Sequence, residues 1–412
     1  MATSREFEIV LLGATGFTGR LVAEQLARPD PSDPRPLRWA IAGRSAGKLA
    51  EVAAALATIS PGAPAPAQLV VDVTDGAALA ALAARTSVVC STVGPYAQHG
   101  SGVVAACVAA GTHYCDLTGE AHWVRQMIDR HHAEAQASGA RIVHCCGFDS
   151  IPSDLGVWYL QRGLIDDGGP AASVLGLVAS LRGGASGGTL ASMIGVAEAA
   201  RRDPAARRIM ANPHGLDPEP RRHRDEVPDQ LGVRWDRALG VVTGPWLMAS
   251  INRRVVHRSN ALLGHTYGAD FRYQEVMSRP ASPRGAVRAL TMAGATLGLL
   301  AAAGVPPVAA ALARRLPAGA GPDAEARARG RFRLHLVAVD APGRPMVTVS
   351  DDADPGYGST CKMLAQSATC LARDPLTSPG GITTPAAAMG QHLLARLQAI
   401  GPRFERGHWR SA

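Results

Sequence analysis

A glycine-rich turn near the start of the chain carries the clearest chemical signal. It follows the apolar run FEIVLL (7–12) and precedes a stretch with helical periodicity. Glycines there allow a tight turn and let the backbone approach a pyrophosphate, which the free N–H groups and positive dipole end of the helix can bind. The alternative is a strand–helix turn that needs glycine for steric reasons alone. The predicted dinucleotide-binding residues are Gly13, Ala14, Thr15, Gly16, Phe17, Thr18 and Gly19.

The end of the second predicted strand decides which dinucleotide binds. An NAD site would place Asp or Glu there, to accept a hydrogen bond from the ribose 2′-hydroxyl. The chain instead has Arg44 and Ser45, with Lys48 one helical turn later. A guanidinium can form a fork to a 2′-phosphate, and charge-assisted bonds of ~1.5–3 kcal/mol give a ~10- to 100-fold preference. We therefore predict NADP as the cofactor; the alternative is that Arg44 only covers the sheet edge in solvent.

Two more strand ends complete the predicted cofactor site. The third strand ends where the adenine ring usually lies, and the fourth ends where the chain should pass the nicotinamide ribose. Glycine allows the backbone to approach there, and the following proline stiffens it. The residues concerned are Asp72, Val73, Thr92, Val93, Gly94 and Pro95.

Strands and helices alternate through the first third of the chain. Apolar runs predict strands, and the segments between them have helical periodicity. This alternation with short connections predicts an α/β fold built on a doubly wound parallel (Rossmann) sheet, over residues 1–165. The predicted strands are 7–12, 38–42, 69–73, 87–93, 112–116 and 140–146, and the predicted helices include 46–57, 76–84, 101–110 and 120–138.

A second, α+β domain is predicted over residues 166–380. Residues 331–339 alternate between apolar and polar side chains, and the turn 341–344 leads back into 345–350, which predicts an antiparallel hairpin. A strand is expected at 173–181, a helix near 189–201, and a polar, proline-rich surface loop at 202–230. A last helix is expected near 385–399, within a C-terminal segment 381–412.

Composition removes several classes of protein. The 412 residues hold 42 Lys+Arg against 34 Asp+Glu, a net charge of +8, with 47% hydrophobic residues, so most of the chain is expected to fold. Lys48 and Lys362 are the two lysines, and a lysine-dependent phosphate loop is missing. No basic run is interleaved with aromatics, and we expect no nucleic-acid partner.

Seven cysteines without a CxxC pair indicate a reducing, cytoplasmic setting rather than a disulfide scaffold. We predict no metal site, because the neighbours His144, Cys145 and Cys146 would point to alternate faces of a strand. Charged residues near the start, Arg5 and Glu6 among them, interrupt any signal-peptide core.

An uncharged stretch of 22 residues, 291–312, is bracketed by Arg288 and by Arg314 with Arg315. Glycine and prolines at 304–307 interrupt it, so a hydrophobic hairpin over 286–316 is more natural than a single membrane span. Packing within the protein or a homodimer is one reading. Peripheral docking on the inner face of the plasma membrane is the other, since the arginines would favour anionic lipid.

Several strings together resemble the saccharopine dehydrogenase-like oxidoreductases, and three later ones resemble the trans-acting enoyl reductases that serve polyketide synthases in lipid and glycolipid synthesis. The resemblance implies an NADP-binding domain, a substrate domain, and a C-terminal helix that packs back on the first domain. The first set comprises GATGFTG (13–19), AGRS (42–45), TVGPYAQHG (92–100), HYCDLTGE (113–120) and CGFDSIPSD (146–154). The second comprises SGGTLAS (186–192), RRVVHRSNALL (253–263) and TPAAAMGQHLLARL (384–397).

Enoyl reduction needs a hydride at the β-carbon, a donor for the enolate oxygen and a proton at the α-carbon. Loops after the strands should supply these groups. The phenols of Tyr114 or Tyr96 could donate to a thioester carbonyl, and Asp116 could orient them. Helix capping is the competing role for Asp116 and Glu120, and likewise for Asp149 and Ser150 ahead of Pro152.

These inferences predict an NADPH-dependent enoyl reductase of long-chain acyl or polyketide intermediates, free or carrier-bound. One rival is a saccharopine-type amino-acid dehydrogenase, which would need arginines converging on a substrate with several carboxylates. The other is a non-catalytic NADP-binding adaptor of a membrane or synthase.

Overall fold

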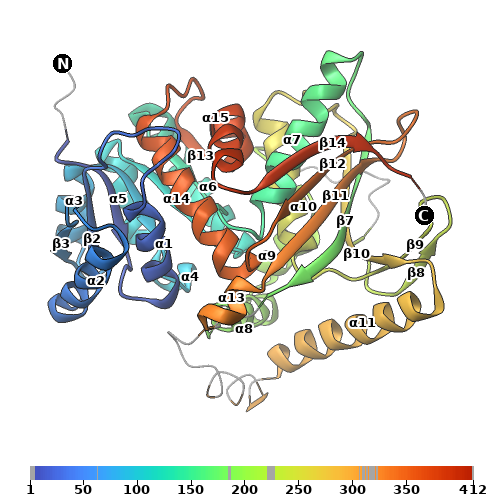
Figure 1. Cartoon of the computed structure of the whole chain (residues 1–412), viewed down its shortest axis with the longest axis horizontal. Coiled ribbons are helices and arrows are strands. Elements are labelled where there is room, and N and C mark those ends of the chain that lie inside the picture. Colours follow the sequence, from blue (N-terminus) through green and yellow to red (C-terminus); the bar gives the residue numbers. More distant parts are fainter. Residues whose placement is uncertain are drawn as a thin grey trace.

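A computed structural model of the chain describes residues 5–62, 64–183, 187–219, 228–305 and 323–410, with the isolated positions 307, 308, 311, 314 and 321. The side chains of 187–190 and 300 are outside this description. Two seven-stranded sheets organise these residues, one in each half of Figure 1.

The first sheet is entirely parallel, which confirms the predicted doubly wound fold. Its order is β13-β6-β5-β4-β1-β2-β3. From β1 the chain first adds β2 and β3 on one side and then returns to add β4 on the other, so the strand order switches between β1 and β4. Ligands of such sheets bind at the carboxyl ends of the strands on either side of that switch. The strands are β1 (Phe7–Leu12), β2 (Trp39–Gly43), β3 (Ala67–Val70), β4 (Thr86–Ser91), β5 (His113–Asp116), β6 (Arg141–Val143) and β13 (Gly381–Thr383).

Both faces of this sheet are covered by helices because its strands are apolar on both sides. Along β1, Ile9 and Leu11 enter one core while Val10 and Leu12 enter the other. One face packs on α1 (Phe17–Ala27), α2 (Ala46–Ile59) and α14 (Thr360–Arg373). The other packs on α3 (Gly76–Arg85), α5 (Ser101–Ala110) and α6 (Ala121–Ser138). The short α4 (Tyr96–His99) follows β4.

The second sheet is mixed, with order β14-β12-β11-β7-β10-β9-β8. The predicted hairpin is present, with β11 and β12 antiparallel, whereas β7 and β10 are parallel. Its strands are β7 (Ser173–Arg182), β8 (Arg234–Asp236), β9 (Val241–Gly244), β10 (Arg272–Pro280), β11 (Arg331–Ala338), β12 (Pro345–Asp351) and β14 (Arg403–His408).

Helices α7 (Ile151–Asp166) and α10 (Ala249–Leu262) contact this second sheet at β10, β11 and β12. Helix α11 (Pro283–Gly304) contacts β9 and β10 and lies at the margin of the molecule in Figure 1. The remaining helices are α8 (Gly187–Arg202), α9 (Pro204–Ala211), α13 (Ala324–Ala328), the π-helical turn η1 (Pro355–Ser359) and α15 (Pro385–Ala399).

Two sequence-based expectations need correction or completion. The expected surface loop 202–230 is wrong in part: it begins with α9, and Leu216 and Asp217 beyond that helix are buried. The apolar stretch forms one helix up to Gly304, as the glycine and prolines there indicated. Most of the second arm of the expected hairpin 286–316 lies outside the described residues.

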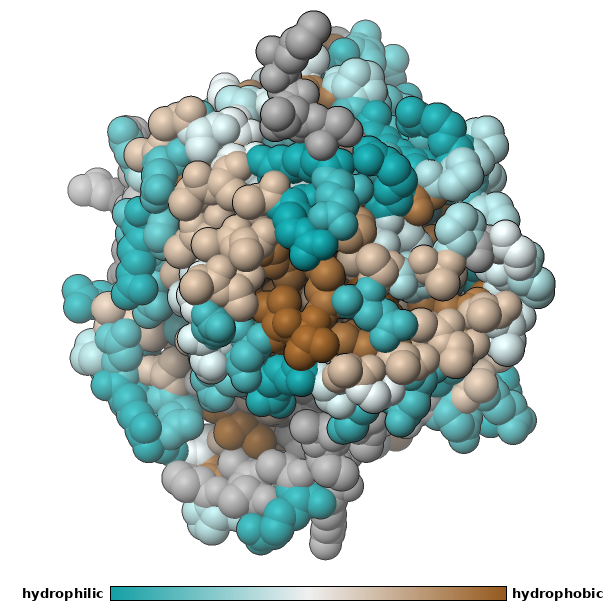
Figure 2. Space-filling view, turned by 90° about the vertical axis from the view of Figure 1, so that its left-hand side faces the viewer, coloured by the Kyte–Doolittle hydropathy of each residue, from teal (hydrophilic) through white to brown (hydrophobic). Residues whose placement is uncertain are grey.

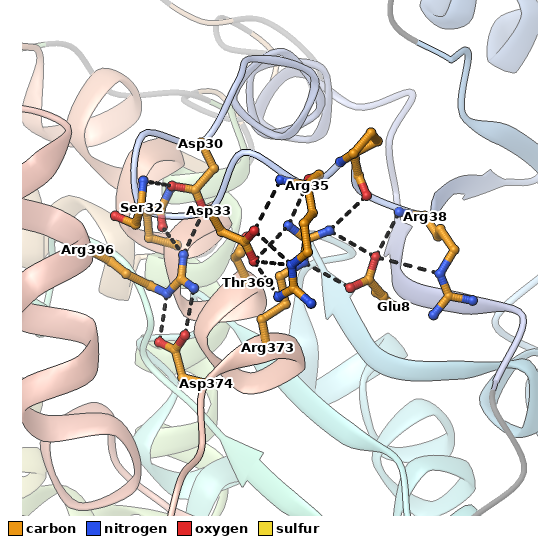
Figure 3. A network of polar contacts seen from close by, with 12 residues as sticks. Glu8, Asp30, Ser32, Asp33, Arg35, Arg38, Thr369, Arg373, Asp374 and Arg396 are labelled. Atoms are coloured by element: carbon orange, nitrogen blue, oxygen red, sulfur yellow. Dashed lines mark hydrogen bonds and ion pairs between the residues drawn. The ribbon is translucent and has the colours of Figure 1, made fainter.

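The C-terminal segment is shared between both sheets. β13 joins β6, α15 packs against α7 and α14, and β14 pairs with β12. Figure 3 shows how one arginine from α14 and one from α15 bind these helices to β1 and to the loop after α1. Arg373 pairs with Glu8 and Asp33, and Arg396 pairs with Asp30 and Asp374. All of these partners are largely shielded from solvent, so the network fixes α14 and α15 against the first sheet.

Candidate cofactor and active site

The glycine-rich turn has the geometry that close backbone approach requires. Gly13 has a φ of +89°, a left-handed conformation that favours glycine. A Cβ on Gly19 would lie 2.1 Å from the carbonyl oxygen of Gly13, so this position accepts no side chain. A Cβ on Gly16 would meet nothing closer than 3.4 Å. Packing therefore demands glycine at 13 and 19, while position 16 is left open toward a ligand.

Helix α1 begins with an uncapped N-terminus. Gly16 is the N-cap residue, and no side chain bonds to the first-turn N–H groups. Those groups have no partner inside a helix and carry its positive dipole end. Phe17 in this turn packs edge-on against Tyr357 of η1, with ring centroids 5.0 Å apart. The turn thus contacts η1, and its N–H groups are available to a diphosphate.

Arg44 directly follows β2 and presents its guanidinium to solvent. The residue is exposed, and no ion pair joins it to a carboxylate in the part of the chain that the structure describes. Ser45 caps α2, its hydroxyl accepting from the N–H of Lys48 at 3.4 Å. Arg44 and Lys48 are both exposed at this strand end, which fits a 2′-phosphate.

The third and fourth strand ends lie on either side of this cradle. The pKa of Asp72 lies below its ordinary value, chiefly because the N–H and hydroxyl of Thr74 donate to its carboxylate, with nearby Arg44 contributing. Val73 packs on the adjoining core. Thr92 donates its hydroxyl to the carbonyl oxygens of Leu12 and Gly13, both at 3.2 Å. The parallel order therefore brings the predicted cofactor residues to one edge.

Next along that edge, Val93 packs beside Thr92 against Gly13. A Cβ added to Gly13 would lie 2.8 Å from the side chain of Val93. Gly94 is exposed, and Pro95 is the N-cap residue of α4. Ala14 is fully buried, Thr15 lies beside Gly43, and the carbonyl of Thr18 faces the thiol of Cys361.

The three residues predicted to be catalytic are enclosed beneath the edge. The hydroxyl of Tyr96 donates to the carbonyl of Ser91 at 3.1 Å. Tyr114 is fully buried, and its hydroxyl has no partner in hydrogen-bonding geometry among the described residues. Burial raises the pKa of both phenols well above the usual range, so both stay neutral. Asp116, also fully buried, lies 2.7 Å from Nδ1 of His144. Their catalytic roles stay predictions, and in this conformation they brace the strand ends.

The expected caps are placed differently. Glu120 does not cap α6, the helix it precedes. Its carboxylate instead accepts from the N–H groups of Tyr96 and Ala97, both at 2.9 Å, at the start of α4. The hydroxyl of Ser192 in α8 donates to the same carboxylate at 3.1 Å. Glu120 therefore joins the start of α4, just after β4, to α8.

The loop after β6 holds an acid that the sequence favoured as a helix cap. The side chain of Ser150 donates to Asn252 rather than capping α7. Asp149 accepts no hydrogen bond from any residue within the described part and is partly exposed. Burial raises the pKa of Asp149 to about 6. A carboxyl group with that pKa can hold a proton near neutral pH and release it. Sequence alone could not separate this role from capping, because the difference is one missing hydrogen bond.

Around this loop the two domains form a tight junction. The N–H of Phe148 donates to Thr360 at 3.0 Å, and the ring of Phe148 packs against Phe332, with centroids 4.7 Å apart. Behind it, Glu275 accepts from Ser153 at 2.9 Å and also from Asn252 and Tyr273. Burial raises the pKa of Glu275 despite these donors. The loop that carries Asp149 is consequently held from both sides.

A cavity of about 690 Å³ lies at the opposite edge of the first sheet, between the ends of α1 and α2 and the flank of α14. Of its charged lining residues, Asp30, Arg35, Lys362 and Arg373 form ion pairs, and the cavity lies away from the carboxyl ends of the strands, so we do not assign the chemistry to it. Among the described residues, no group of three His, Cys, Asp or Glu side chains could hold a metal ion.

Comparison with known proteins agrees with this geometry. Residues 9–143 match the saccharopine dehydrogenase NADP-binding domain. A Mycobacterium tuberculosis protein provisionally named a trans-acting enoyl reductase is 42% identical over 97% of both chains. A Mycobacterium leprae protein named trans-acting enoyl reductase is 38% identical over 96% of this chain and 97% of its own. Saccharopine dehydrogenase from Saccharomyces cerevisiae shares the fold, with a TM-score of 0.50, 14% identity, and coverage of 97% and 99% of the two chains. The chain therefore belongs to the saccharopine dehydrogenase-like family of NADP-binding oxidoreductases, together with the full-length relatives named trans-acting enoyl reductases.

Proposed function

We propose that this protein uses NADPH to reduce the carbon–carbon double bond of an enoyl thioester on a long acyl or polyketide chain in lipid or glycolipid synthesis. The observation that carries the proposal is the pairing of an uncapped α1 N-terminus with an unpaired Arg44 at the end of β2. The names of the full-length relatives support the reaction class.

Each part of the site has a distinct role in this reaction. The N–H groups after Gly16 bind the diphosphate, and Arg44 binds the 2′-phosphate. NADPH, when bound, supplies a hydride to the β-carbon of the substrate. The electron pair of the double bond then moves toward the thioester oxygen, and the α-carbon takes the proton of Asp149, whose carboxylate regains one from water. We assign this proton to Asp149 because it is the partly exposed, unpartnered acid of the loop after β6.

The acids of this junction argue against a substrate with several carboxylates. Asp149 and the buried Glu275 both lie on or behind the loop after β6, and each would repel a bound anion when ionised. A saccharopine-type substrate is therefore disfavoured relative to a neutral thioester.

The test is NADPH oxidation by purified protein with a long-chain 2-enoyl thioester, with the product identified by mass spectrometry. Formation of the saturated thioester in a one-to-one ratio with NADPH consumed supports the proposal. Oxidation seen only with a 2-oxo acid and an amine would identify an amino-acid dehydrogenase instead. Tight NADPH binding without turnover of either substrate would identify a non-catalytic adaptor.

A further inference from the structure

Helix α11 exposes large apolar side chains to solvent, whereas an ordinary surface helix buries them. The buried residues that face the second sheet, Gly285, Ala289 and Ala293, are small, and the half-buried Met292 packs beside them. Three of its large apolar side chains point outward: Val287 and Leu290 are each 60% exposed and Leu297 is 42% exposed. These three recur at helical spacing, so they form one stripe along the solvent side.

The usual reasons for an apolar helix do not apply to α11. By length and composition it could cross a bilayer, yet only 18% of its most apolar stretch is buried inside the protein. It is therefore not a core helix. Its inner face packs against β9 and β10, which is inconsistent with a span surrounded by lipid. A helix in this position needs a binding partner that contacts only its outer, solvent-facing side.

A tryptophan extends the same surface. A Cβ on Gly244 would point toward Ala289 of α11, and Val242 lies on the same face of β9 because side chains alternate along a strand. Trp235 of β8 is directly opposite Val242 and so shares that face. It is 65% exposed at the free edge of the sheet. Tryptophan is the residue most suited to the boundary between lipid and water.

Unpaired arginines border this surface. No described carboxylate forms an ion pair with any of them, and the guanidinium of Arg237 lies 5.8 Å from the Trp235 ring centroid. Arg201 bonds to the carbonyl of Gly304 at the far end of α11. A second copy of this chain would bring like charges together, whereas an anionic lipid surface would neutralise them. The arginines are Arg201, Arg237, Arg284 and Arg288.

We propose that the outer face of α11, with Trp235 and its bordering arginines, docks on an anionic membrane surface. The helix lies in the plane of the interface, with Val287, Leu290 and Leu297 inserted at the level of the acyl chains. This inference does not depend on the proposed reaction, because binding can be measured without turnover.

The experiment is co-sedimentation of the full chain with vesicles of phosphatidylglycerol or of phosphatidylcholine. We expect binding to phosphatidylglycerol that weakens with salt, and a blue shift of tryptophan emission that Trp235→Phe diminishes. Arg284→Gln with Arg288→Gln should weaken binding about 30-fold, from about 1 kcal/mol per arginine. Leu290→Gln with Leu297→Gln should weaken it about 100-fold.

Val70→Gln is the matched control. Val70 is also 60% exposed, but it lies in edge strand β3 at the other end of the protein. Figure 2 shows that end, where a hydrophobic patch has hydrophilic residues above and below it. This variant should bind vesicles like the wild type, and unchanged NADPH affinity in all variants would show that they fold. Equal loss in the control, absence of vesicle binding, or self-association abolished by the Leu290 and Leu297 changes would each overturn the proposal.

Discussion

Replacing Arg44 by alanine should convert a cofactor site that prefers NADPH into one that hardly distinguishes NADPH from NADH. The guanidinium is exposed, and in the described part of the chain its removal breaks no ion pair and weakens only the electrostatic interaction with nearby Asp72. The loss is confined to charge-assisted bonds with the 2′-phosphate, at about 1.5–3 kcal/mol. NADPH affinity should fall about 10- to 100-fold while NADH affinity stays within a factor of two or so.

Titration calorimetry with both nucleotides measures this difference directly. Arg162→Ala is the matched control, since Arg162 is an exposed arginine on α7 whose ion-pair partner within the described ranges is Asp166. It should change neither affinity. Equal weakening of NADPH and NADH by Arg44→Ala, or no weakening of either, would refute the assignment of Arg44 to the 2′-phosphate.

Three further predictions concern the turn and two acids. Gly16→Ala should fold normally and lose NADPH affinity, whereas Gly19→Ala should lower thermal stability itself, because its Cβ would meet the Gly13 carbonyl at 2.1 Å; calorimetry and thermal melts separate the two. Asp149→Asn should lower kcat about 100-fold. It should also abolish the fall in wild-type kcat/KM expected as pH rises through the Asp149 pKa of about 6, and a preserved pH profile would contradict its role. Burial raises the pKa of Asp154 to about 7, whereas in the unfolded chain the same group ionises near pH 4. The free energy of unfolding should therefore fall as the pH rises from about 4 to 7, because the unfolded state loses this proton more easily. Chemical denaturation of Asp154→Asn should show a smaller fall.

The first sheet and its cofactor edge could be predicted from sequence because local signals determine them. Apolar runs separated by helical periodicity specify parallel strands, and the order of their ends follows from right-handed crossovers. The glycine turn and Arg44 lie directly at those ends, so their residue types and their places in the sheet both fit a dinucleotide. Sequence could not show that β13 completes the sheet, because that pairing joins residues some 240 positions apart in the chain.

Candidate catalytic residues are harder to assign from sequence, because the exposure of a side chain decides whether a substrate can reach it. Tyr96 follows β4, and Tyr114 and Asp116 lie in β5, yet all three side chains are buried. Glu120 resembled a local helix cap, and its partners are instead the N–H groups of Tyr96 and Ala97, 24 and 23 positions away. A capping motif specifies a hydrogen bond within its own turn, whereas these contacts depend on tertiary packing.

The central claim is hydride transfer to a carbon–carbon double bond. Its most direct test uses NADPH deuterated at the transferring position of the nicotinamide, together with a long-chain 2-enoyl thioester. The claim predicts one deuterium at the β-carbon of the saturated product and a solvent-derived hydrogen at the α-carbon. A product without deuterium, or deuterium delivered to the carbon of an imine or ketone, would contradict it.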